Sequence, residues 1–100
     1  MKRAKSIERL AGVDVVERGS VTLVLSTAAN RIIDFCESNN ICIIGIDGFR
    51  VRGLAVIPCM DAIADFSGTS AAESIRLART FVNATMQFDM WYEFVFESGD

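Results

Sequence analysis

The sequence contains no histidine, three cysteines and a single proline among its 100 residues. Without histidine, serine and cysteine side chains lack the base that usually activates them as nucleophiles. Structural zinc sites and disulfides need paired thiols, but Cys36, Cys42 and Cys59 are an odd set without Cys-x-x-Cys spacing. We therefore expect three reduced cysteines buried in apolar surroundings, with neither a metal nor a cofactor.

Lysine and long apolar stretches are also scarce. No lysine follows Lys5, which excludes a P-loop, and the glycines at positions 45, 48 and 53 do not match a dinucleotide-binding fingerprint. The apolar run 41–46 is far shorter than the roughly 20 residues that span a bilayer. Charges interrupt the N-terminal stretch before a signal-peptide core can form. These absences predict a soluble, cytoplasmic protein that does not bind a membrane.

Charge is distributed unevenly along the chain. The formal net charge is −3, but residues 1–18 hold five basic and three acidic side chains, whereas residues 19–100 hold five basic and ten acidic ones. An acidic body repels nucleic acid and attracts basic partners. The charge pattern therefore predicts a basic protein partner and no direct contact with nucleic acid.

Apolar spacing predicts one domain, residues 1–100, in which residues 1–20 form a peripheral N-terminal segment. Apolar residues at helical spacing indicate a short helix over 2–11, ended by Gly12, and a longer helix over 27–39, ended by Asn39-Asn40. Residues 13–25 fit either a hairpin around Arg18-Gly19 or an N-terminal extension of the longer helix, and the sequence leaves this choice open. A further helix begins at Ser70, which has capping-box spacing to Glu73.

The remaining segments indicate β-strands. Residues 41–46 are expected to form a central strand, followed by a type I′ hairpin turn at Asp47-Gly48. Arg52-Gly53 is predicted to turn the chain again or to form a bulge, and Pro58 to end the strand pairing. The alternation in "YEFVFE" predicts a final half-buried strand. Together these elements predict an α+β fold: a small, mostly antiparallel sheet with two main helices packed on one face, plus a short N-terminal helix.

Two groups of side chains are candidates for function. The first group is Asp47, Asp61 and Asp65, which would hold Mg²⁺ if residues 60–66 formed a helical turn. The second group is Asp89, Trp91 and Glu93, which are aromatic and acidic residues typical of protein contacts. An acidic contact surface is favoured over a metal site, because no lysine or histidine lies near the aspartates for proton transfer.

The segment "NNICIIGIDGF" follows an amphipathic helix and precedes a second strand, "DFS", a capped helix and the "YEFVFE" strand. This combination resembles small bacterial toxin-immunity proteins of the type that neutralises tRNA-cleaving colicins, which show a similar Ile-x-Gly-Ile-Asp-Gly segment in the same helix–strand order. The resemblance covers residues 26–97, and residues 1–20 have no counterpart in it. It implies a non-catalytic acidic protein that occludes the cleft of a basic nuclease, partly by imitating the charge of RNA. Phe49-Arg50 replace the aromatic or histidine residues expected just after the glycines, so the resemblance does not name the target.

We therefore expect an immunity or inhibitor protein whose partner contacts are Asp47, Asp61, Asp65, Asp89, Trp91 and Glu93. Two alternatives remain open: a small homodimeric structural or interaction domain, and a metal-dependent enzyme that uses the three aspartates. An exposed apolar patch on the sheet would favour the homodimer.

Overall fold

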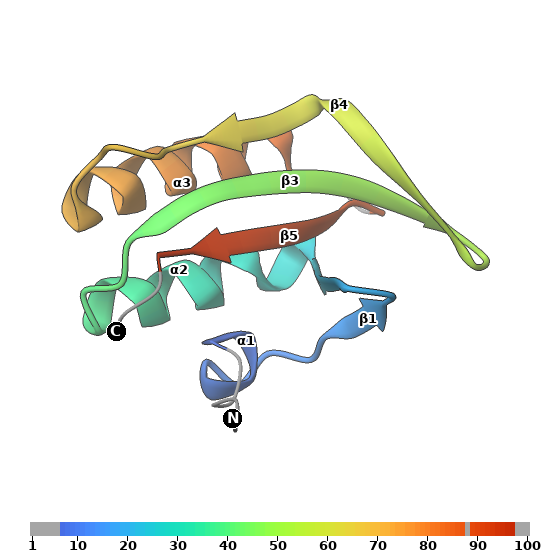
Figure 1. The fold of residues 1–100 in the computed structure, drawn as a ribbon, viewed down its shortest axis with the longest axis horizontal. Coiled ribbons are helices and arrows are strands. Elements are labelled where there is room, and N and C mark those ends of the chain that lie inside the picture. The colour runs from blue at the N-terminus through green and yellow to red at the C-terminus, as the bar shows by residue number, and fades with distance from the viewer. Residues whose placement is uncertain (1–6, 88, 98–100) are drawn as a thin grey trace.

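The computed structural model describes residues 7–87 and 89–97 of the chain. These residues form three α-helices, a short 3₁₀ turn and one five-stranded sheet (Figure 1). In chain order the elements are α1 (Ile7–Leu10), β1 (Val16–Arg18), β2 (Val21–Leu25), the 3₁₀ turn (Ser26–Ala28), α2 (Ala29–Ser38), β3 (Ile43–Arg52), β4 (Ala55–Asp65), α3 (Ala71–Thr85) and β5 (Trp91–Phe96).

The sheet has the strand order β1-β2-β5-β3-β4, and every neighbouring pair is antiparallel. The last strand in the sequence, β5, therefore lies between β2 and β3. Helices α2 and α3 both cover the same face of the sheet. Helix α1 lies near β1, at the β1 end of the strand order (Figure 1). This arrangement confirms the expected α+β fold with two main helices and a short N-terminal helix.

The ambiguous segment 13–25 contains a β-hairpin, which is one of the two structures that its sequence allowed. Strands β1 and β2 pair from Val16 opposite Leu23 to Arg18 opposite Val21, and Gly19 has a φ of 63° in the turn between them. β2 also pairs with β5 on its other side. Pairing on both edges overrides the helical stripe that the valines show in the sequence. The helix itself covers Ala29–Ser38, inside the predicted 27–39.

Both predicted helix ends have the left-handed backbone that stops a helix. Asn40 follows α2 with a φ of 56°, and Gly12 follows α1 with a φ of 80°. Helix α1 covers Ile7–Leu10, and residues 2–6 of the predicted helix lie outside the described residues. Gly12 and Asn40 therefore act as expected from their local conformational preferences.

The predicted turn at Asp47-Gly48 is wrong, because β3 runs straight through both residues. Gly48 pairs with Tyr92 and does not have a positive φ. A Cβ at position 48 would lie 2.7 Å from the Cβ of Ala62, so the glycine is required by close packing rather than by a turn. The chain reverses instead at Gly53-Leu54, where Gly53 has a φ of 60° and Arg52 pairs with Ala55.

The prediction that Pro58 ends strand pairing was also wrong. The helical turn over 60–66, which the metal-site alternative required, does not form. β4 continues to Asp65, and Pro58 lies opposite Phe49 within it. The register between β3 and β4 then shifts before pairing resumes at Ile63. Proline is tolerated here because β4 is the edge strand, whose outer side has no neighbour in the sheet.

The core lies between the sheet and helices α2 and α3. β5 alternates as predicted, with Tyr92 and Phe94 buried against the helices. The Tyr92 hydroxyl and Thr85 Oγ1 lie 2.6 Å apart, within hydrogen-bonding distance, which ties β5 to the end of α3. The buried stripe of α3 consists of Ser74, Ile75, Ala78 and Val82. Cys36 is fully buried, whereas Cys42 and Cys59 are only partly so, and all three thiols are free.

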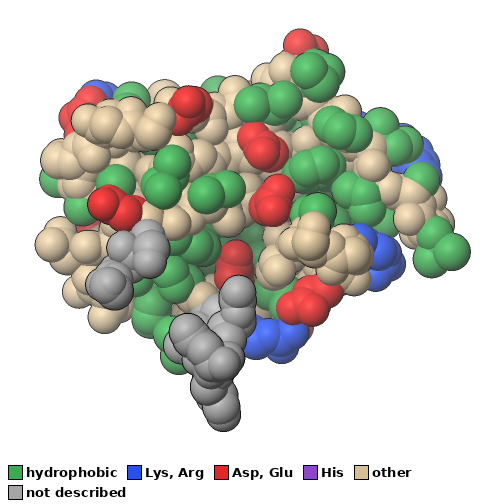
Figure 2. Space-filling view, in the orientation of Figure 1, with side chains coloured by type: hydrophobic (Ala, Val, Ile, Leu, Met, Phe, Trp, Pro, Cys, Tyr) green, Lys and Arg blue, Asp and Glu red, His purple; other side chains and the backbone are tan. Residues whose placement is uncertain are grey.

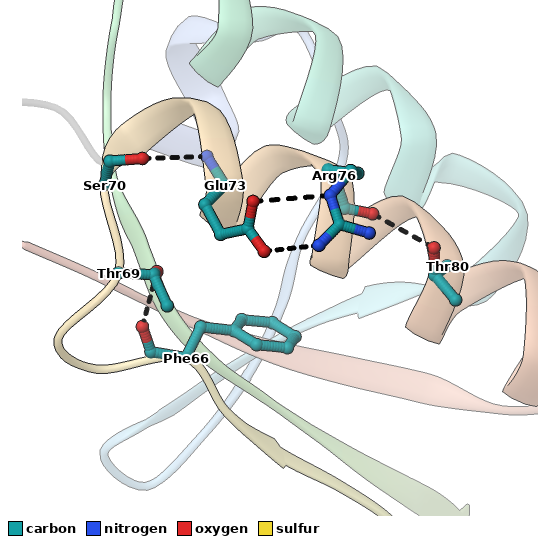
Figure 3. Close-up of polar contacts among 6 residues, drawn as sticks. All are labelled: Phe66, Thr69, Ser70, Glu73, Arg76 and Thr80. Atoms are coloured by element: carbon teal, nitrogen blue, oxygen red, sulfur yellow. Dashed lines mark hydrogen bonds and ion pairs between the residues drawn. The ribbon is translucent and has the colours of Figure 1, made fainter.

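Helix α3 begins at the predicted cap. The Ser70 hydroxyl accepts a hydrogen bond from the Glu73 amide at 3.1 Å (Figure 3). The Glu73 carboxylate forms an ion pair with Arg76 on the next turn. Ser70 therefore satisfies one amide that would otherwise lack a partner.

No helix in the described ranges is long and apolar enough to cross a membrane.

Candidate partner-binding surface

The sheet face opposite α2 and α3, here called the helix-free face, carries the side chains that alternate with the core residues of β5. Tyr92 and Phe94 point toward the helices, so Trp91, Glu93 and Val95 lie on the helix-free face. In the sheet register, Asp47 lies between Glu93 on β5 and Ile63 on β4. These three residues form a central row across three strands.

Mainly apolar rows border this central row. On one side Gly45 lies between Val95 and Asp65, and on the other Phe49 lies between Trp91 and Pro58. Ile63 is 48% exposed and Val95 42% exposed, so both apolar side chains reach solvent. Figure 2 shows this face, with acidic side chains gathered over its middle and hydrophobic side chains around them. The surface combines negative charge with accessible apolar area.

Asp47 and Glu93 are like charges directly opposite each other on neighbouring strands, an arrangement that destabilises a sheet. Burial raises the pKa of Glu93 above its ordinary value, and the charges of Asp47 and Glu8 raise it further. Within the described part of the chain, neither Asp47 nor Glu93 forms an ion pair. The fold therefore keeps two neighbouring carboxylates together without an ion pair to any residue in the described ranges.

Asp65 lies at the end of β4 beside this pair. Its carboxylate accepts hydrogen bonds from the Ser67 amide at 2.9 Å and the Ser67 hydroxyl at 2.6 Å. These bonds lower the pKa of Asp65 below its ordinary value. Asp65 therefore stays ionised and adds to the negative potential of the helix-free face.

Asp61 and Asp89 lie apart from the central row. Asp61 is exposed in the irregular stretch of β4 and borders a hollow of about 340 Å³ together with Ala84 and Gln87 near the end of α3. Asp89 precedes β5 and forms ion pairs with Arg50 and, at 4.0 Å, with Arg52. Of the six predicted contacts, the fold thus brings together Asp47, Asp65, Trp91 and Glu93.

The geometry does not favour the alternative metal site. Across residues 7–87 and 89–97, no three acidic or thiol side chains lie close enough together to hold a metal ion. Asp47, Asp61 and Asp65 are spread along extended strands, because 60–66 is not the helical turn that the metal-site hypothesis required.

Burial also determines the state of the one fully buried thiol. It raises the pKa of Cys36 to about 12, with a smaller effect in the same direction from the charge of Glu8. A thiol with such a pKa stays protonated at neutral pH and is a weak nucleophile.

Sequence reasoning missed two residues of this surface. Val95 could have been found, because it follows from the same alternation that identified Glu93. Ile63 could not, because its position depends on β4 being a strand.

No protein-family model, no curated protein and no solved structure matches the chain. The resemblance to toxin-immunity proteins therefore stays a prediction that depends on a short segment of β3.

Proposed function

We propose that the protein is a non-catalytic inhibitor of the immunity type, which binds a basic nuclease domain through its helix-free face and occludes the nuclease cleft. A single observation carries the proposal. Asp47 and Glu93 are held side by side, without an ion pair in the described residues, in the middle of a sheet face that also exposes apolar side chains.

The distribution of ion pairs supports this choice of face. On the helix layer, Arg79 of α3 pairs with Asp34 at 2.8 Å and with Glu37 at 2.7 Å, both on α2. Asp34 and Glu37 are thus compensated within the fold, whereas Asp47 and Glu93 have no ion pair among residues 7–87 and 89–97. A basic partner would supply the missing positive charge, speed association by electrostatic attraction and bury the apolar rows.

The candidate partner is the nuclease domain of any toxin whose reading frame proves to lie next to that of this chain, and the proposal is tested with that domain. Cleavage of tRNA by that domain is measured with increasing amounts of the protein, at about 0.05 M and about 0.5 M salt. We expect inhibition that saturates at one protein per nuclease, with weaker binding at the higher salt. Unchanged cleavage at low salt with an excess of the protein would contradict the proposed function.

A second function is favoured by a specific observation, the exposed apolar residues of the β3–β4 hairpin and the edge strand. Leu54 is 91% exposed, Met60 77% and Ile57 46%. Such a patch on an edge strand is a typical site of self-association. The alternative function is therefore a homodimeric interaction domain that pairs through β4.

Sedimentation velocity at low micromolar concentration separates the two functions. A monomer that still inhibits the nuclease supports the inhibitor. A stable dimer that does not inhibit the nuclease, and that Met60→Lys converts to a monomer, supports the homodimer.

A further inference from the structure

The hollow of about 340 Å³ near the end of α3 is rich in sulfur. Three of the nine residues that line it carry a sulfur atom, namely Cys59, Met60 and Met90, whereas only seven of all 100 residues are cysteine or methionine. The proportion in the whole chain would put fewer than one sulfur atom among nine residues. Sulfur side chains are therefore concentrated around this hollow.

Met90 is held in place just before β5. It is only 3% exposed, its amide donates a hydrogen bond to the Gln87 carbonyl at 3.1 Å, and its carbonyl accepts one from the Ser26 amide at 2.9 Å. A Cβ at position 48 would lie 3.1 Å from Met90 Sδ, so Gly48 keeps space open beside the sulfur atom. The Met90 thioether therefore stands on a fixed backbone, next to a position that has no side chain.

The irregular stretch of β4 supplies the other two sulfur atoms. The register between β3 and β4 shifts around Gly48, so residues 59–62 of β4 lie opposite this single residue. Adjacent side chains of a regular strand point to opposite faces, whereas a bulge can redirect one of them, and here both Cys59 and Met60 line the hollow. Cys59 is a free, partly buried thiol that packs against the core, and Met60 is 77% exposed. The sulfur atoms thus extend from the floor of the hollow to its open rim.

This set of ligands has a definite metal preference. Thiols and thioethers are soft ligands that select Cu⁺ over Mg²⁺ and Ca²⁺, which prefer oxygen. One thiolate and two neutral thioethers around a monovalent cation carry no net charge, which avoids the cost of placing an uncompensated charge in a partly buried site. Arg50 also lines the hollow, but its positive charge is offset by an ion pair with Asp89.

We propose that Cys59, Met60 and Met90 bind a single Cu⁺ ion in this hollow. The S–H bond of Cys59 breaks as its sulfur bonds to the metal, and the proton passes to solvent; each methionine sulfur donates a lone pair, and no electron is transferred. The inference goes beyond the proposed function and does not depend on it, because the hollow lies apart from the central row of the helix-free face. It departs from the expectation of a metal-free chain, which concerned thiol pairs, histidines and carboxylates but not thioethers.

Competition with bicinchoninate, a coloured chelator of Cu⁺, measures binding to the full chain without oxygen. We expect the wild type to withdraw one equivalent of Cu⁺ from the chelator. Cys59→Ser should weaken binding at least about a hundredfold, because loss of an outer-shell partner alone costs about 10- to 100-fold. Cys42→Ser removes another partly buried thiol, which does not line this hollow, and should bind Cu⁺ like the wild type.

The methionines are tested separately, by variants that keep their apolar character. Met60→Leu changes an exposed side chain, so the fold should be unaffected, and Cu⁺ affinity should fall about tenfold. In NMR spectra, Cu⁺ should shift the methyl signals of Met60 and Met90, while that of Met86, which does not line the hollow, should stay in place. No withdrawal of Cu⁺ by the wild type, equal losses in Cys59→Ser and Cys42→Ser, or wild-type affinity in Met60→Leu would overturn the Cu⁺ site.

Discussion

At the scale of single residues, Glu93 is placed where three effects act in the same direction. Burial, the charge of Asp47 and the charge of Glu8 all raise its pKa. Its folded-state pKa is therefore above the unfolded value of 4.5, and the folded protein holds this proton more tightly than the unfolded chain does. The contribution of Glu93 to stability is fully present below the unfolded value and is lost as the pH rises through the raised pKa.

Glu93→Gln should therefore be more stable than the wild type at neutral pH, by a few tenths to about 1 kcal/mol, because glutamine removes the repulsion from Asp47. The advantage should disappear when Glu93 is protonated, so the two proteins should match at low pH. Urea unfolding at about pH 4 and about pH 7 measures both differences. A variant less stable than the wild type at the higher pH would show that Glu93 is not repelled.

Gly48 illustrates a residue whose role the sequence misassigned. The pair Asp47-Gly48 is a strong local turn signal, but local signals do not report that a neighbouring strand approaches closely. Only the pairing of β3 with β4 and β5 shows that a side chain at position 48 would meet Ala62 and Met90.

Gly48→Ala should destabilise the protein by about 1 to 3 kcal/mol, because the new Cβ would lie 2.7 Å from the Cβ of Ala62. Denaturant unfolding measures the loss. Gly48→Ala/Ala62→Gly should recover part of it, since the closest contact is then removed. A Gly48→Ala variant as stable as the wild type would contradict the packing role of this glycine.

At the scale of elements, predictions succeeded where the deciding information is local. The start of α3 follows from the Ser70 side chain, and the end of α2 from the left-handed conformation that asparagine tolerates. The sequence left segment 13–25 open because its valines fit both periods, and the pairing of β2 with β1 and β5 determines that it is a hairpin. The same holds for the site: the sequence identified Glu93 and Trp91 by alternation, but which aspartates join them depends on the sheet register.

Ser70→Ala tests the local origin of α3. The Glu73 amide would lose its hydrogen bond to the Ser70 hydroxyl, and unfolding should cost about 1 kcal/mol less. Ser70→Asp keeps a side-chain acceptor at the cap and should retain most of the wild-type stability, which makes it the matched control. Equal losses in both variants, measured by urea unfolding, would exclude capping as the cause.

At the scale of the whole molecule, charge is arranged by face. Arginines of the helix layer compensate nearby carboxylates, as Arg79 does for Asp34 and Glu37. The helix-free face holds Asp47 and Glu93 without such a partner in the described residues, next to exposed apolar side chains. The net charge of −3 therefore understates the negative potential on one side of the molecule.

The most direct test of this arrangement is the association rate constant with the nuclease domain, measured by stopped-flow fluorescence across a series of salt concentrations. The wild-type rate should fall as salt rises; Asp47→Asn/Glu93→Gln should associate about tenfold more slowly at low salt and lose most of the salt dependence. Asp34→Asn/Glu37→Gln carries the same net charge and should associate like the wild type. Indistinguishable rates for the two double variants would show that the helix-free face is not where a basic partner docks.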